Sequence, residues 1–221
     1  MTFARALGYG LCLWAGLVAT PSWAMDQQGI NAFTLRVVKA LGPQRSVDGM
    51  IIGRWRDGFD RHDRGIGSVS FTERRGDSDF NFAYQGQFYR YGQTGMEHRL
   101  WQQLRHRFRF SSGTYELSGR LEERFLPNDR SGERFRLFNR WSQPVAYGFN
   151  LNLGYEWMYN LSTLSPNTRK GVNHRRVMLS LQRPVLSIPR MDWEYQIGVV
   201  DRQRGPSFMQ HQLQVRYSLN L

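Results

Sequence analysis

Cysteine is nearly absent from this chain, because its 221 residues contain only Cys12. A single thiol excludes an intramolecular disulfide and any zinc site built from several cysteines. Lysine is also scarce, with only Lys39 and Lys170 among 30 residues of lysine and arginine. The formal net charge of +12 therefore comes almost wholly from arginine. Excess arginine can indicate nucleic-acid binding, so the placement of the arginines decides what the charge means.

A long apolar segment is missing from most of the chain. Beyond Ala24 no run of about 18 apolar residues occurs, so no membrane-spanning helix is expected there. The first residues differ, because Arg5 precedes an apolar stretch at 6–19 and small residues follow near Ala24. This arrangement is typical of a secretory signal. We expect a signal peptide at 1–24, cleaved near Ala24, and one domain at 25–221.

Strict alternation of apolar and polar residues occupies the stretch from Tyr147 to Tyr159. Alternation of period two indicates a β-strand with one apolar face. Aromatic residues stand at both ends of that face and leucines in its middle, as in a strand that crosses a bilayer. At about 3.3 Å per residue and a tilt of about 45°, such a strand rises roughly 28 Å. The apolar face consists of Tyr147, Phe149, Leu151, Leu153, Tyr155, Trp157 and Tyr159.

The same alternation recurs along the chain and predicts ten strands. It is clear at 97–110, 114–125, 133–143, 172–183, 190–201 and 209–221, and less regular at 49–56, 68–72 and 80–89. The stretch 31–41 is ambiguous, because its apolar residues fit both a strand and a helix ended by Gly42 and Pro43. Single-chain bacterial barrels have an even number of strands. We therefore predict ten strands, or twelve if 31–41 is a strand and a further one is hidden.

The connections between these segments alternate in length. Short ones lie at 111–113, 144–146 and 186–189, and longer polar ones at 126–132, 162–171 and 203–207. Short periplasmic turns and longer outer loops produce this rhythm in membrane barrels. The fold we predict is all-β, a transmembrane antiparallel up-and-down barrel of about 10 strands, 12 being the alternative, with a charged lumen. Ten strands place both ends of the barrel domain on the periplasmic side.

This fold predicts a location and a set of partners. We expect the mature protein in the outer membrane of a Gram-negative cell, surrounded by outer-membrane lipid. The last strand, which alternates as membrane strands commonly do, is the expected contact with the barrel-assembly machinery. If the apolar face meets lipid, the arginines point into a lumen, so no nucleic-acid partner is expected. A soluble periplasmic β-protein that binds acidic polymers is the alternative, and it requires arginines that face solvent.

Acidic and basic residues share the polar faces of several predicted strands. Charges packed in a narrow barrel are costly unless they are paired. Paired forks of arginine and carboxylate would fill the interior and hold the strand register. This predicts a structural or partner-binding component. The alternative is a narrow arginine-lined passage or pocket for an anionic solute or polysaccharide, since the excess of arginine over glutamate attracts anions. The predicted lumen network consists of Arg105, Arg107, Glu116, Arg120, Glu122, Arg124, Arg136, Arg140, Glu156, Arg176 and Glu194.

Enzymatic chemistry has little support in the sequence. A hydrolase at the rim of a barrel needs a nucleophile, a histidine and an orienting acid close together. His98 and His174 lie near predicted outer strand ends, and Glu97 and Ser162 lie in outer regions, but no spacing connects them. We predict no catalytic, cofactor or metal site. A rim-active enzyme acting on lipid or polysaccharide remains the alternative function.

A series of short motifs resembles a known bacterial family over roughly residues 80–220. The motifs are Tyr89-Arg90-Tyr91, Glu97-His98-Arg99-Leu100, Arg120-Leu121-Glu122-Glu123-Arg124, Arg134-Phe135-Arg136-Leu137-Phe138-Asn139-Arg140, Tyr155-Glu156 and His174-Arg175-Arg176. In this order they resemble the outer-membrane family catalogued as domain of unknown function 2490. The resemblance implies a barrel with a charged interior and no established activity.

Overall fold

The computed structural model describes most of the chain beyond its first residues. The described residues are 26–56, 61–89, 95–127, 130–163, 170–187, 190–202 and 207–220. The predicted signal peptide at 1–24 lies outside these ranges. Within them, no helix has the length and apolar character needed to cross a membrane.

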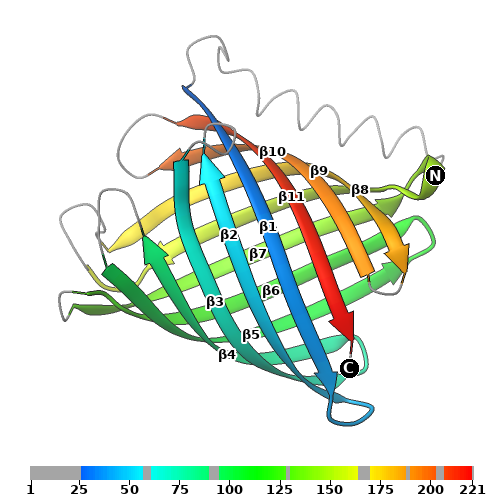
Figure 1. The fold of residues 1–221 in the computed structure, drawn as a ribbon, viewed down its shortest axis with the longest axis horizontal. Coiled ribbons are helices and arrows are strands. Elements are labelled where there is room, and N and C mark those ends of the chain that lie inside the picture. The colour runs from blue at the N-terminus through cyan, green and yellow to red at the C-terminus, as the bar shows by residue number, and fades with distance from the viewer. Residues whose placement is uncertain are drawn as a thin grey trace.

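The described residues form eleven strands that close into one barrel (Figure 1). Each strand from β2 to β11 pairs antiparallel with the strand before it in the chain, so the topology is a simple meander. The all-β barrel predicted from the sequence is confirmed. The strands are β1 (Asp26–Ala40), β2 (Arg45–Arg56), β3 (Arg61–Arg75), β4 (Ser78–Tyr89), β5 (Gly95–Phe110), β6 (Gly113–Phe125), β7 (Ser131–Pro144), β8 (Asn150–Asn160), β9 (Gly171–Ser187), β10 (Arg190–Arg202) and β11 (Phe208–Asn220).

The barrel closes through a parallel seam, which corrects the expected strand number. β1 and β11 run side by side in the same direction, with Asp26 opposite Phe208 and Val38 opposite Asn220 (Figure 1). An odd number of meander strands makes the first and last strands parallel, whereas the even-number rule demands an antiparallel seam. β1 therefore begins at the end of the barrel opposite to the end where β11 stops. The described chain has eleven strands, not ten or twelve.

The ambiguous stretch 31–41 belongs to a strand rather than a helix. Ile30, Ala32 and Thr34 are buried, whereas Phe33 between them is 48 % exposed, as period two requires. Backbone pairing with β2 on one side and β11 on the other uses the hydrogen-bonding groups of this stretch. A helix at this position would leave both neighbouring strands with unpaired edges.

The strand expected at 147–159 is shorter than its apolar pattern. β8 begins at Asn150, and a one-turn 3-10 segment (η3, Ala146–Gly148) precedes it. Tyr147 and Gly148 both have positive φ, 59° and 73°, and the Phe149 amide donates to the Ala146 carbonyl. Two left-handed residues in succession are the backbone of a tight hairpin turn between twisted strands. The alternation therefore continues by coincidence through a turn, and Tyr147 is 87 % exposed.

The barrel is inverted relative to a water-soluble protein. Its outward positions carry many large apolar side chains, and its inward positions carry charged ones. Among the exposed outward residues are Phe33, Ile51, Val69, Phe80, Phe82, Tyr84, Leu100, Leu104, Leu117 and Leu121. Among the buried charged residues are Asp79, Glu97, Arg99, Glu116, Glu122, Arg124, Arg134 and Glu156. Period-two alternation along every strand separates the two sets.

Candidate functional site

The functional candidate is the charged lumen, which the register of neighbouring strands assembles. Glu122 on β6 lies opposite Arg134 on β7, and Glu156 on β8 lies opposite Arg176 on β9. Directly opposite residues in a sheet have Cβ atoms only about 5 Å apart, so opposite charges at these positions attract. Every member of these pairs stands at an inward position of its strand. The antiparallel register thus places ion pairs along the inner faces of β6–β9.

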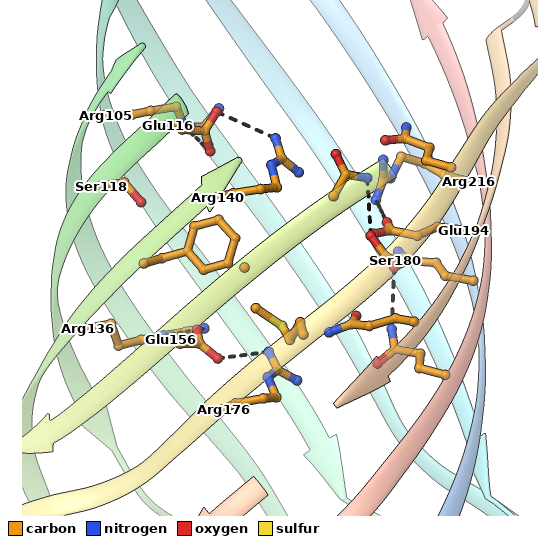
Figure 2. A pocket seen from close by; sticks show the side chains of 18 of the residues that line it. Arg105, Glu116, Ser118, Arg136, Arg140, Glu156, Arg176, Ser180, Glu194 and Arg216 are labelled. Carbon is orange, nitrogen blue, oxygen red and sulfur yellow. Dashed lines mark hydrogen bonds and ion pairs between the residues drawn. The ribbon is translucent and has the colours of Figure 1, made fainter. Parts of the chain in front are cut away.

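Glu156 is held between two arginines from the strands on either side. An oxygen of Glu156 lies 2.8 Å from Nη2 of Arg176, and Arg136 donates from Nε across 3.1 Å and from Nη2. Figure 2 shows the carboxylate between the two guanidinium groups. Glu156 is only 2 % exposed. Two positive partners compensate for removing this carboxylate from water, so its position is fixed by attraction from both sides.

Glu122 is the second buried acid and extends the same network. It accepts from Arg134 and, across 2.9 Å, from Nη1 of Arg136. Arg136 therefore bridges Glu122 and Glu156, which stand on β6 and β8 on either side of it. A planar guanidinium with several donors can serve two carboxylates in this way, whereas a lysine ammonium has no fixed fork.

Arg120 and Arg136 lie directly opposite each other, an unfavourable like-charge pair. The structure separates their charges by giving each a different partner. Arg120 stacks over the ring of Trp101 at 4.0 Å and donates to Gln103 across 2.6 and 2.9 Å. Its distance to Glu122 is longer, 3.6 Å. Arg120 thus belongs to the network mainly through an aromatic face and an amide, which the charge pattern alone does not reveal.

A second group of charges surrounds Glu116 nearer the short turns. Arg105 and Arg140 approach its carboxylate at 3.6 Å each (Figure 2). Arg107 approaches it at 3.4 Å. These contacts are looser than those of Glu156. Arg107 makes its shorter contact, 2.6 Å, with the buried Asp79 on β4. Asp79 is a member of the lumen network that the sequence analysis missed, because β4 has no regular alternation of charge.

Arg124 pairs with Glu97, which the sequence analysis considered only as the orienting acid of a rim hydrolase and left out of the lumen network. Its Nε donates to Glu97 across 2.5 Å, and Arg99 donates to the same oxygen across 2.8 Å. Glu97 is 1 % exposed and faces the lumen. The neighbouring His98 faces outward, where its Nδ1 lies 2.5 Å from the Tyr84 hydroxyl. Glu97 therefore does not orient His98, and the period-two rule applied to 97–110 would have placed this acid among the arginines.

Glu194 stands apart from the other predicted acids. Its one described ion pair is with Arg216 on β11, at 3.6 Å (Figure 2). The wall around it is built mainly of amides rather than charges. Gln210 donates to Gln212, Gln212 to Gln214, and Gln214 to the Thr34 hydroxyl of β1. The lumen therefore has many of its ion pairs on β4–β9, whereas amide side chains form much of the wall on β11.

Two cavities remain inside the barrel between the side chains of its walls. The larger, of about 640 Å³, is lined among the described residues by eight arginines and three glutamates, Glu116, Glu156 and Glu194. The smaller, of about 390 Å³, lies toward the end where β2 stops and is lined by seven arginines and no described acid. Ion pairing therefore leaves both open space and surplus positive charge in the interior. Such a site can attract and hold small anions.

The comparisons with known proteins give a family but no activity. The model of the family described as "Protein of unknown function (DUF2490)" matches residues 33–209. Neither the curated proteins nor the solved structures contain a match. The matched residues run from β1 to β11 and include all the predicted lumen charges. The chain belongs to the family of proteins of unknown function DUF2490.

Proposed function

We propose that this protein is an outer-membrane barrel whose arginine-rich lumen admits small anions. The observation that carries the proposal is the reversed distribution of polarity, with apolar side chains outside and surplus arginine inside. The protein acts in this proposal without covalent chemistry, as a narrow conduit or binding chamber. The packed ion pairs of β5–β9 then serve to hold the barrel's shape.

The apolar exterior supports the membrane location. Water-soluble monomers rarely expose large contiguous apolar patches, whereas a lipid-facing barrel requires them. Phe82, Leu104 and Ile51 are 51, 59 and 64 % exposed and stand on three different strands. The alternative of a soluble protein requires arginines that face solvent. Arg99, Arg124 and Arg134 are instead 6 to 8 % exposed.

The charge balance of the interior supports anion entry. The larger cavity has five more arginines than glutamates among its described lining residues. Rings of arginine or lysine are the usual selectivity device of anion and phosphate pores. A low-dielectric wall strengthens their field, so anions concentrate and cations are repelled.

Two measurements test the membrane part of the proposal. Full-length protein should fractionate with outer membranes, require detergent for extraction, and migrate faster on a gel before boiling than after. Stable aqueous solubility without detergent would contradict the membrane location.

Planar-bilayer recording tests the conduit. In a KCl gradient we expect the reversal potential to be shifted from zero toward the equilibrium potential of chloride. Replacement of Arg140 and Arg216 by glutamine should move it toward zero, because both line the larger cavity. The matched control is Arg75→Gln, since Arg75 is exposed at the β3–β4 turn and pairs with Glu73. A cation-selective current, or no current from correctly folded barrels, would overturn the conduit.

A further inference from the structure

The two cavities meet at a boundary made of three arginines. Of all described residues, only Arg54, Arg136 and Arg176 line both the larger and the smaller cavity. Arg136 and Arg176 belong to β7 and β9. Arg54 belongs to β2, which the strand order places across the barrel from them. Any solute that moved from one cavity to the other would pass between these side chains.

Two of the three arginines are fixed by acids. Arg136 donates to Glu122 and Glu156, and Arg176 donates to Glu156 across 2.8 Å. Their orientation therefore does not depend on a bound solute. The Nε atom of Arg176 is nevertheless buried without a hydrogen-bond partner in the described structure. Preorganised donors with spare capacity are what an anion site requires.

Arg54 differs because it forms no ion pair with a described acid, although it lies within electrostatic reach of Asp63. Its cross-strand neighbours are Ala32 on β1 and Arg64 on β3, so the register supplies no carboxylate. Asp63 is already held by Arg56 and Arg64, at 2.8 and 3.0 Å. Arg54 makes no hydrogen bond or ion pair with any described residue, and its buried Nε has no partner. A guanidinium that is partly withdrawn from water and forms no ion pair is unfavourable, which favours a further negative charge supplied from outside the chain.

We propose that Arg54, Arg136 and Arg176 form a binding site for a phosphate-class oxyanion at the boundary of the two cavities. Arg54 supplies the free guanidinium fork, and Glu156 acts as a positioning residue that holds the other two. A guanidinium matches the geometry of a tetrahedral oxyanion with two parallel donors, which chloride cannot exploit. The site rests on the proposed function only in that anions must be able to enter the lumen.

Calorimetric titration of inorganic phosphate into the full-length protein, refolded in detergent, tests this site. Arg54→Gln should weaken phosphate binding by about tenfold or more, the usual effect of losing a charge-assisted hydrogen bond. Arg75→Gln, which removes an equal charge outside the lumen, should leave the affinity unchanged. Arg216→Gln, which alters the larger cavity only, should have a smaller effect than Arg54→Gln. Equal affinity in Arg54→Gln and Arg75→Gln, or an equal loss in Arg216→Gln, would overturn the site.

A second measurement, the unfolding temperature, uses the unaltered protein and so does not depend on whether a variant folds. Phosphate should raise the unfolding temperature of the unaltered protein, and chloride at the same ionic strength should not, because only a ligand of the native state stabilises it. An equal effect of both salts would overturn phosphate-class recognition. Phosphate binding without ion conduction would preserve the site and overturn the conduit. Anion current without phosphate binding that depends on Arg54 would preserve the conduit and overturn the site.

Discussion

Glu156 on β8 and Arg176 on β9 lie directly opposite in the register and are joined by a 2.8 Å contact inside the barrel. This pair connects three levels of the molecule. The alternation of β8 turns Glu156 inward, the antiparallel register brings Arg176 beside it, and Arg136 on β7 completes its surroundings. Arg176 lines both cavities, and Glu156 lines the larger one. The ion pairs that hold neighbouring strands together therefore lie beside the cavities that contain surplus positive charge.

Replacing Glu156 by glutamine should destabilise the barrel by about 3 kcal/mol, the lower end for breaking a buried ion pair. The physical reason is that two part-buried arginines, Arg136 and Arg176, lose their shared counter-charge. Urea unfolding in lipid vesicles, followed by tryptophan fluorescence, measures the change. Glu194→Gln is the matched control, because Glu194 has one longer contact of 3.6 Å with Arg216, and its loss should be markedly smaller. Equal losses would contradict the central role of Glu156.

An arginine placed on the outer face should destabilise the protein in a depth-dependent way if that face meets lipid. Leu117 lies near the middle of β6 and Phe125 is its last residue. We expect Leu117→Arg to cost about 2–4 kcal/mol and Phe125→Arg about 0–1 kcal/mol, as for lipid-facing positions of known barrels. Reversible folding into lipid vesicles gives both values. Similar small losses at the two positions would contradict a lipid-facing exterior.

The parallel seam predicts a specific cross-link. Leu35 on β1 is opposite Tyr217 on β11, and neighbouring strands are about 4.8 Å apart, within disulfide range. With Cys12 replaced by serine, the double variant Leu35→Cys with Tyr217→Cys should form an intramolecular disulfide under mild oxidation. A gel shift that is reversed by reductant detects it. Leu35→Cys with Met209→Cys should not cross-link, because Met209 is opposite Gln27. The opposite pattern would contradict the eleven-strand closure.

The turn before β8 offers a stabilising substitution. Tyr147 has a φ of 59° and is 87 % exposed, so its side chain contributes little packing while its backbone is strained. Asparagine tolerates the left-handed region and favours this turn when glycine follows, as Gly148 does. We expect Tyr147→Asn to raise the free energy of unfolding by about 1 kcal/mol. Tyr147→Ala removes the same ring without easing the backbone, and a gain there equal to that of asparagine would contradict the explanation.

Much of the site could be anticipated from alternation alone. Once a segment is a strand, its even and odd residues face opposite sides, so Glu116, Arg120 and Glu122 necessarily share a face. Partners on other strands could not be anticipated in the same way. Asp79 meets Arg107 and Glu97 meets Arg124 because of register, which depends on turns and on closure of the whole barrel.

The sequence by itself determined that the chain alternates, which residues face together, and that arginine rather than lysine supplies the interior charge. These are local properties, since the pleat of a strand assigns each side chain to a face. Only the tertiary structure decided that eleven strands close through a parallel seam, that Tyr147 lies in a turn, and that Arg54 forms no ion pair with a described acid. Each of these depends on which distant segment lies beside or across from another, and that arrangement is settled only when the barrel closes.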